Sequence, residues 1–212
     1  AIAGGRSAIA ALMVLAILKK PSFKWSVWKA AGAASYAITV ISFVIATKLT
    51  TAANAILIQY TAPVYVALFG AWFLNEKASL IDWISIIAVM GGMVLFFMDS
   101  FTPGGLLGNI IAIVSGVSFA GVAMFLRKQK DESPLESVFW GNVVTALVCL
   151  PFMFQSVPNG RSIVGVIILG VVQIGLSYIL YSIAIKKVTA LEAVLIPVIE
   201  PILNPIWVAL VV

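Results

Sequence analysis

The stretch ATKLTTAANAILIQYTAP, residues 46–63, decides the fold of this chain, because a second copy of it follows 138 residues later. The copy reads AIKKVTALEAVLIPVIEP and covers residues 184–201. Eight of the eighteen aligned positions are identical without a gap, namely 46, 48, 51, 52, 55, 57, 58 and 63 of the first copy. Both copies are strongly apolar, and a repeat built of membrane helices is typical of secondary transporters, whose binding sites lie between the repeats.

The composition places the chain in a membrane. Of its 212 residues, 62% are hydrophobic and 10% are charged, and the mean hydropathy is +1.14. A soluble domain carries roughly 25% charged residues, and a soluble fold of this length has too little interior to hide so much apolar surface. We therefore expect an all-α polytopic membrane protein that is embedded in the lipid bilayer. The net charge of +5 does not indicate nucleic acid binding, because the basic residues lie in short loops between apolar segments.

The residue inventory argues against enzymatic chemistry. The chain has no histidine, which removes the commonest metal ligand and the commonest general base. Its single cysteine, Cys149, lies in an apolar segment and cannot form an intrachain disulfide. No Walker sequence for ATP hydrolysis occurs. The sequence predicts a protein that is not an enzyme and that uses neither a cofactor nor a metal.

Eight segments are apolar enough to cross a bilayer, which takes about 20 residues. They are residues 2–18, 30–47, 52–74, 80–98, 105–126, 135–154, 162–185 and 189–212. Ten of the thirteen Lys and Arg residues fall in alternate loops, 19–29, 75–79, 127–134 and 186–190, so the positive-inside rule places these loops in the cytoplasm. The first visible end is then outside, which predicts a further helix before it.

The repeat extends beyond the quoted stretch. With a two-residue change in loop length, Gly5–Ala10 falls on Gly141–Ala146, so segments one to three correspond to segments six to eight. Each repeat would hold five helices if one is missing at each end of the chain, and an odd number makes the repeats opposite in orientation. We expect two domains, residues 1–98 as a first repeat lacking its first helix and residues 99–212 as a second repeat lacking its last helix.

This pattern resembles the EamA family of the drug/metabolite transporter superfamily. The resemblance lies in the five-plus-five helices, the basic loop after helix two, the Asn75-Glu76-Lys77 turn and the matched prolines of TAP and IEP. The visible segments would be helices two to nine of ten. The resemblance implies a secondary transporter or exporter of amino acids and other small metabolites, with a central cavity between the repeats. Arg6, Glu76 and the Glu200-Pro201 pair match family positions.

Segment eight carries the strongest candidate site. Glu200 lies near its middle, where a charged side chain costs roughly 2.5–3.5 kcal/mol, and the prolines around it free backbone carbonyls. Glu200 and Asn204 share a face at helical spacing, with Trp207 near it. These groups would bind a substrate or a proton; the alternative is that Glu200 caps a structural kink. The predicted hinge prolines are Pro63, Pro197, Pro201 and Pro205.

Polar stripes on neighbouring segments extend this site. Gln173, Ser177 and Tyr181 follow each other at i, i+4 and i+8, and Thr39 belongs to the equivalent stripe of the first repeat. In lipid such a stripe faces protein or water, so it lines a cavity or forms interhelical hydrogen bonds. The other candidates for substrate binding are Gln59, Tyr60 and Ser118. For Arg6, two orientations stay open, outward to the interface or into the cavity.

Together these patterns predict an alternating-access transporter in the plasma membrane of a prokaryote. Its partner would be a small, amphipathic substrate, and transport would be driven either by a proton gradient, with the proton as a second partner, or by the gradient of the substrate itself. A lipid-linked carrier or flippase on the same scaffold is the alternative. The small residues at 91, 92, 104, 108, 116, 120, 165, 170 and 175, all of them glycine except Ala120, are predicted to allow close helix packing. Nothing in the sequence indicates an oligomeric state.

Overall fold

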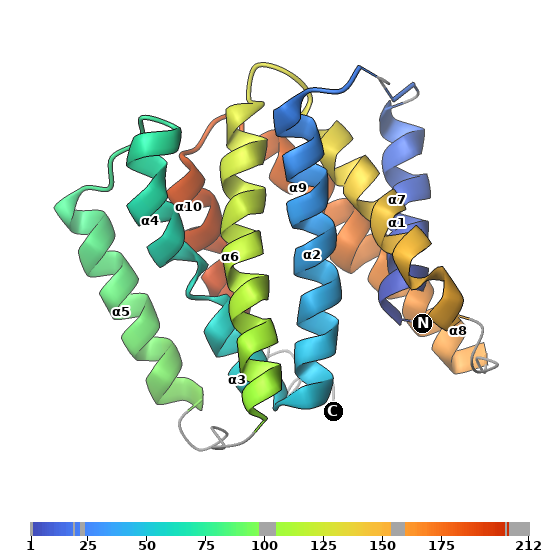
Figure 1. Ribbon diagram of the computed structural model, residues 1–212, viewed down its shortest axis with the longest axis horizontal. Helices are drawn as coiled ribbons and strands as arrows, with labels where there is room; N and C mark the ends of the chain where they lie inside the picture. The colour runs from blue at the N-terminus through green and yellow to red at the C-terminus, as the bar shows by residue number, and fades with distance from the viewer. Residues whose placement is uncertain are drawn as a thin grey trace. The chain divides into compact units, whose positions relative to one another are not determined.

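The computed structural model describes residues 2–18, 20–21, 24–97, 105–153, 160–201 and 203, and Figure 1 shows them as helices joined by short loops. The first half of the chain forms α1 (Ile2–Leu18), α2 (Val27–Leu49), α3 (Ala52–Gln59), α4 (Ala62–Phe73) and α5 (Leu80–Phe97). The second half forms α6 (Leu106–Lys128), α7 (Pro134–Met153), α8 (Gly160–Ile168), the π-helix η2 (Leu169–Leu176), α9 (Ser177–Ala184), α10 (Ala190–Leu195) and the 3-10 turn η3 (Ile196–Val198). The described residues contain no strand, so the all-α prediction is confirmed.

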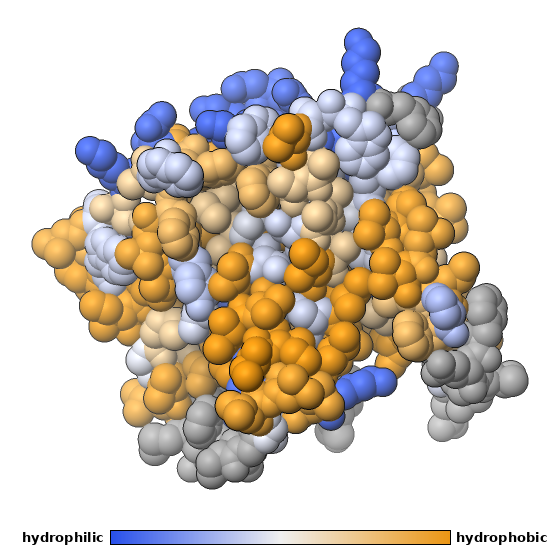
Figure 2. Space-filling model, viewed as in Figure 1, coloured by the Kyte–Doolittle hydropathy of each residue, from blue (hydrophilic) through white to orange (hydrophobic). Residues whose placement is uncertain are grey.

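The helices have the length and surface of membrane spans. Five stretches are long and apolar enough to cross a bilayer, namely Val27–Leu49, Ala52–Phe73, Leu106–Lys128, Pro134–Met153 and Ser162–Ala184, and Ile2–Leu18 and Leu80–Leu95 are shorter apolar helices. Apolar side chains cover much of the exposed helix surface (Figure 2), among them Leu12, Trp72 and Leu95. The chain is a polytopic membrane protein.

Three predicted spans differ from continuous α-helices. Segment three breaks at Tyr60 and Thr61, because Pro63 in the first turn of α4 has no N–H to continue the helix. Segment seven passes through η2, and segment eight passes through η3 at Pro197. The sequence predicted these as apolar segments with hinge prolines, and the irregular turns of segments three and eight contain or adjoin Pro63 and Pro197. The π-helix of segment seven was not predicted, because apolar periodicity does not distinguish an α-turn from a π-turn. The residues after 203, including the predicted site residues Asn204 and Trp207 and the hinge Pro205, lie outside the described residues.

The two copies of the opening motif start with the same helix cap. The Thr51 hydroxyl accepts a hydrogen bond from the Asn54 N–H at 3.1 Å before α3, and the Thr189 hydroxyl accepts one from the Glu192 N–H at 3.2 Å before α10. Glu192 in turn accepts from the Thr189 N–H at 2.7 Å, which completes a capping box. The identical threonines therefore set the starts of both helices.

The chain divides into two compact units that interleave the halves of the sequence. Unit 1 contains Ala1–Ile41 and Phe125–Lys187, and unit 2 contains Ser42–Met124 and Val188–Val212. Each unit takes helices from both halves, and α2 and α6 each begin in one unit and end in the other.

Helices that correspond in the repeat run in opposite directions within each unit. In unit 1, Gly4 near the start of α1 lies against Cys149 and Met153 near the end of α7. In unit 2, Gly108 at the start of α6 lies against the backbone just before α3, whereas Ala190 at the start of α10 belongs to the same cluster as Ala123 near the end of α6. The inversion predicted from loop charge is therefore present in the structure.

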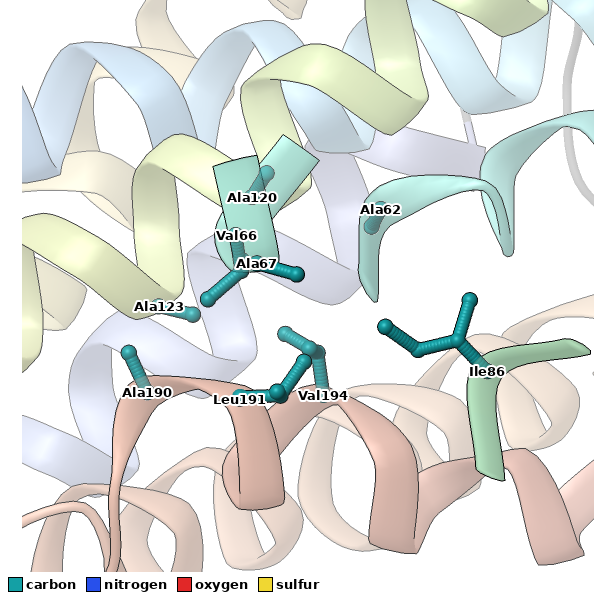
Figure 3. Packing of buried hydrophobic residues seen from close by; sticks show 9 residues of the cluster. All are labelled: Ala62, Val66, Ala67, Ile86, Ala120, Ala123, Ala190, Leu191 and Val194. Carbon is teal, nitrogen blue, oxygen red and sulfur yellow. The ribbon is translucent and has the colours of Figure 1, made fainter. Parts of the chain in front are cut away.

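Small residues form the core of unit 2. Figure 3 shows this cluster, which brings α4, α5, α6 and α10 together and consists of Ala62, Val66, Ala67, Ile86, Ala120, Ala123, Ala190, Leu191 and Val194. Four of the nine side chains are fully buried alanine or valine with no exposed surface, Ala62, Ala120, Ala123 and Val194. Small side chains allow helix backbones to approach closely, which membrane helices need because lipid gives them no hydrophobic drive to associate.

Only part of the predicted glycine packing is present. Gly108 and Gly116 lie against backbone atoms of unit 2, and Gly170 lies against α1 in unit 1. At Gly91 and Gly92, in contrast, no described atom lies within 4 Å of an added Cβ, and the same holds for Gly165. The prediction was wrong for these three positions, because the sequence does not tell which side of α5 or α8 faces a neighbour.

Candidate functional site

In unit 2, a hydrogen bond connects segment three to segment eight at the points where their helices are interrupted. The Tyr60 hydroxyl donates a hydrogen bond to the Pro197 carbonyl at 3.2 Å. That carbonyl is free because residue 201, four positions later, is a proline without an N–H. The Tyr60 ring packs against Met93 and Val198. The same position of the repeat is therefore broken in both copies, and one side chain bridges the breaks.

A second bridge from the break reaches α6. Gln59 Nε2 donates to Ser115 Oγ at 2.8 Å, and Ser115 is fully buried. Gly116 lets the α6 backbone lie against the carbonyls of Ile58 and Gln59. Ser118, half-buried, follows Ser115 on α6. Gln59 and Tyr60 are thus neighbours at the helix break after α3, and each donates a hydrogen bond to another helix of unit 2.

In the proline-rich part of segment eight, the structure describes the residues up to Pro201 and residue 203, including the candidate carboxylate of Glu200. Glu200 is exposed, whereas Pro201 beside it is buried. Pro63, Pro197 and Pro201 lie at or directly after the breaks. A proline that interrupts a helix without breaking its packing allows bending. A hinge role for these prolines and a binding role for Glu200 stay predictions.

Replacing Tyr60 with phenylalanine should loosen the contact between the breaks. The variant leaves the freed Pro197 carbonyl without its tyrosine donor, and we expect a loss of about 1 kcal/mol in the free energy of unfolding, the usual contribution of one hydrogen bond. Thermal unfolding of the purified protein in detergent measures this. Tyr65→Phe, on α4 in the same unit, is the matched control, and an equal shift in both variants would contradict the bridging role.

Unit 1 holds a polar cluster contributed by α1, α2, α7, η2 and α9. Arg6 on α1 donates through Nη1 to Gln173 Oε1 at 3.2 Å, and it interacts electrostatically with Tyr36 and Tyr178. Tyr36, fully buried on α2, donates to Asn142 Oδ1 on α7 at 3.2 Å. The rings of Tyr36 and Tyr178 meet edge to face, with centroids 4.7 Å apart. Helices from both sequence halves thus contribute polar groups to one cluster.

The three members of the predicted stripe on segment seven have different contacts. Gln173 contacts Arg6, Ser177 donates to its own Val172 carbonyl at 3.1 Å, and Tyr181 packs against Tyr178 with ring centroids 5.9 Å apart. The π-turn of η2 changes the spacing between the first two members, so i, i+4 no longer describes one face. Thr39 is buried and donates to the Ser35 carbonyl at 2.8 Å.

The sequence reasoning missed a buried ion pair at the loop end of unit 1. Lys29, in the first turn of α2 and only 5% exposed, pairs with Glu136 in the first turn of α7 and also donates to the Lys24 carbonyl at 2.7 Å. Ser137 donates to Gln129 Oε1 at 2.9 Å, and Gln129 donates to the Trp28 carbonyl at 3.0 Å. The sequence placed Lys29 at the end of the loop 19–29, whereas the structure places it in the first turn of α2.

The other acidic residues near loop ends act as helix caps. Glu76 accepts a hydrogen bond from the Ala190 N–H at 2.9 Å, and Asp82 accepts one from the Ser79 N–H at 2.7 Å. Across the described part of the chain, no group of three or more His, Cys, Asp or Glu residues could hold a metal ion.

Both halves of this chain match the same protein family. A sequence model of the EamA-like transporter family matches residues 1–98 and again residues 106–212. An uncharacterized transporter from Archaeoglobus fulgidus is 30% identical over 170 residues, which are 78% of this chain and 60% of the archaeal protein. The pseudopaline exporter CntI from Pseudomonas aeruginosa is 26% identical over 105 residues, 49% of this chain and 37% of the exporter. The chain thus spans under two thirds of the length of these curated relatives.

The fold also matches a crystal structure. The TM-score is 0.82 at 18% sequence identity, and the match covers 99% of this chain and 77% of the other. A likeness at this identity concerns the fold.

Proposed function

Since this chain belongs to the EamA-like transporter family, we propose that it is a secondary transporter that moves small metabolites by alternating access across the plasma membrane of a prokaryote. The class of solute proposed is amino acids and related amphipathic molecules. The main support is the inverted repeat, because equivalent helices run in opposite directions within each unit and can exchange roles between two states. The name of the Pseudomonas relative, an exporter, favours outward transport.

The polar residues of the helix interiors support a route for a polar solute. Gln59 and Tyr60 lie at the helix break of segment three in unit 2, and in unit 1 Arg6 donates a hydrogen bond to Gln173. Polar and charged residues inside membrane segments are costly and mark substrate or ion pathways. Irregular backbone at membrane depth is tolerated where it lines a cavity or is covered by protein.

The direct test is solute counterflow in liposomes that contain the purified full-length protein. A screen of amino acids, amines, carboxylic acids and sugars for thermal stabilisation selects the solutes, and labelled forms of these are then followed. We expect at least one solute to exchange faster than in protein-free liposomes. If no solute is moved but labelled phospholipid changes leaflet, the protein is a flippase and the proposed solute transport is wrong.

Proton coupling is proposed to depend on Glu200. Glutamine keeps the shape of the side chain but cannot exchange a proton, so Glu200→Gln should abolish the effect of an imposed pH gradient on solute flux while leaving exchange at equal pH. Glu132→Gln, an exposed acid in the loop before α7, is the matched control and should behave as wild type. A Glu200→Gln protein that still responds to the gradient excludes this residue as the proton carrier.

A further inference from the structure

Arg6 is a membrane-embedded cation. It lies twelve residues before Leu18, the last residue of α1, so its Cα is about 18 Å from that end of the helix. A hydrocarbon core is about 30 Å thick. Lys20, which follows α1, belongs to a loop that the charge pattern places at the membrane surface. Arg6 therefore lies well inside the apolar layer, where its charge needs a partner.

The described residues around Arg6 give it no counter-ion. Gln173, Tyr36 and Tyr178, the residues that interact with it, are all neutral. Among the residues that the structure describes, no carboxylate forms an ion pair with Arg6. The position equivalent to Arg6 in the second repeat is Asn142, also neutral, and its carbonyl oxygen already accepts from Tyr36. The arginine charge thus faces dipoles but no carboxylate.

The unused hydrogen-bond donors of Arg6 lie on one edge of the guanidinium. A guanidinium has five N–H donors and no acceptor. Nη1 is engaged by Gln173, whereas Nε is buried and has no acceptor among the described residues. The Nε and Nη2 donors form the side-on edge, whose two parallel N–H bonds match the two oxygens of a carboxylate. The residue is half-buried and its hydrogen bond to Gln173 is exposed, so the Nη end of the guanidinium is reachable from outside the unit, whereas a ligand reaches Nε only after the atoms that cover it move aside.

We propose that Arg6 binds the carboxylate of the transported solute through this edge. Gln173 holds the opposite side of the guanidinium and so fixes its plane, and Tyr36, anchored by Asn142, supports the cluster from α2. The inference rests on the proposed transport function and narrows its substrate class to solutes that carry a carboxylate.

The first test needs no variant. Stabilisation and counterflow of the wild-type full-length protein are compared for leucine and leucinamide, and for other amino acids with their amides. The carboxylate forms should bind better by roughly ten- to a hundredfold, the factor for a hydrogen-bonded charged group. If the carboxylate and amide forms are moved equally, the inference is wrong while the transport function stands. If the wild-type protein moves no solute at all, both fail.

The second test assigns the effect to the side chain. Arg6→Gln should raise the KM for carboxylate solutes by the same factor and leave amide solutes unchanged, whereas Arg6→Lys should keep part of the preference because it keeps the charge without the side-on edge. Lys48→Gln, an exposed cation at the end of α2, is the matched control. Vesicles of dioleoyl phosphatidylglycerol form a third arm. Stabilisation by this lipid that is lost in Arg6→Gln, without a carboxylate preference, would identify a lipid headgroup as the anion and overturn the proposal.

Discussion

Replacing Glu136 with alanine should lower the free energy of unfolding by about 3–5 kcal/mol, because it leaves the buried Lys29 ammonium without its counter-ion. The pair ties the first turn of α2 to the first turn of α7, and the same ammonium also donates a hydrogen bond to the Lys24 carbonyl. A carbonyl dipole cannot neutralise a full charge. Thermal and denaturant unfolding of the purified protein in detergent measures the loss.

Two further variants separate the ion pair from other effects of the substitution. Glu132→Ala removes an exposed carboxylate four residues earlier and should change stability by less than about 0.5 kcal/mol. The double variant Lys29→Met with Glu136→Leu should recover most of the loss, since well-packed apolar residues often replace a buried pair without cost. If the double variant is as unstable as Glu136→Ala, the loss comes from packing at this position and not from the stranded charge.

Replacing Gly108 with alanine should destabilise unit 2 by about 1–3 kcal/mol, the usual cost of overpacking a filled interior. An added Cβ would lie 2.7 Å from the Leu49 carbonyl carbon and 2.7 Å from the Thr50 nitrogen. Both contacts are backbone atoms at the end of α2, so no side-chain rotation relieves them. Unfolding in detergent again gives the free energy, and loss of monodisperse protein on size exclusion marks a complete failure to fold.

Gly91→Ala is the matched control for this substitution. Gly91 is also a glycine within a helix, α5, but no described atom lies within 4 Å of an added Cβ. Alanine should be neutral there or stabilise by up to about 1 kcal/mol, because glycine is a poor helix former. Equal effects at the two glycines would show that helix propensity rather than close packing governs both.

The sequence was sufficient for the fold class because its signals are redundant. Long apolar segments and the placement of loop charges both follow from the need to cross lipid, and the repeat independently relates the two halves of the chain. Thr51 and Thr189, which are identical in the alignment, are the N-caps of equivalent helices. Pro63 and Pro197 indicated in the sequence where the helix breaks at Tyr60 and in η3 would lie. Their bridging by a tyrosine hydroxyl depends on how two helices pack, which no local pattern encodes.

The site was harder to predict because its polar groups are paired across distant segments. Lys29 was placed at the end of a loop and Glu136 at the start of an apolar segment, and their pairing joins positions 107 residues apart. Tyr36 and Asn142 were missed, although the repeat itself offered a signal. Asn142 falls on Arg6 when Gly141 is aligned with Gly5, so a polar residue occupies the same place in both copies.

The interleaving of the two units constrains the order in which this protein can mature during synthesis. Unit 1 joins Ala1–Ile41 to Phe125–Lys187, so its first helix has to wait in the bilayer until the ribosome has produced more than half of the chain. Unit 2 similarly needs residues from Val188 onward. Contacts this distant in sequence are slow to form. The early apolar segments must therefore be tolerated singly by lipid or by insertion machinery, and cutting the chain between its repeats would leave neither fragment with a complete core.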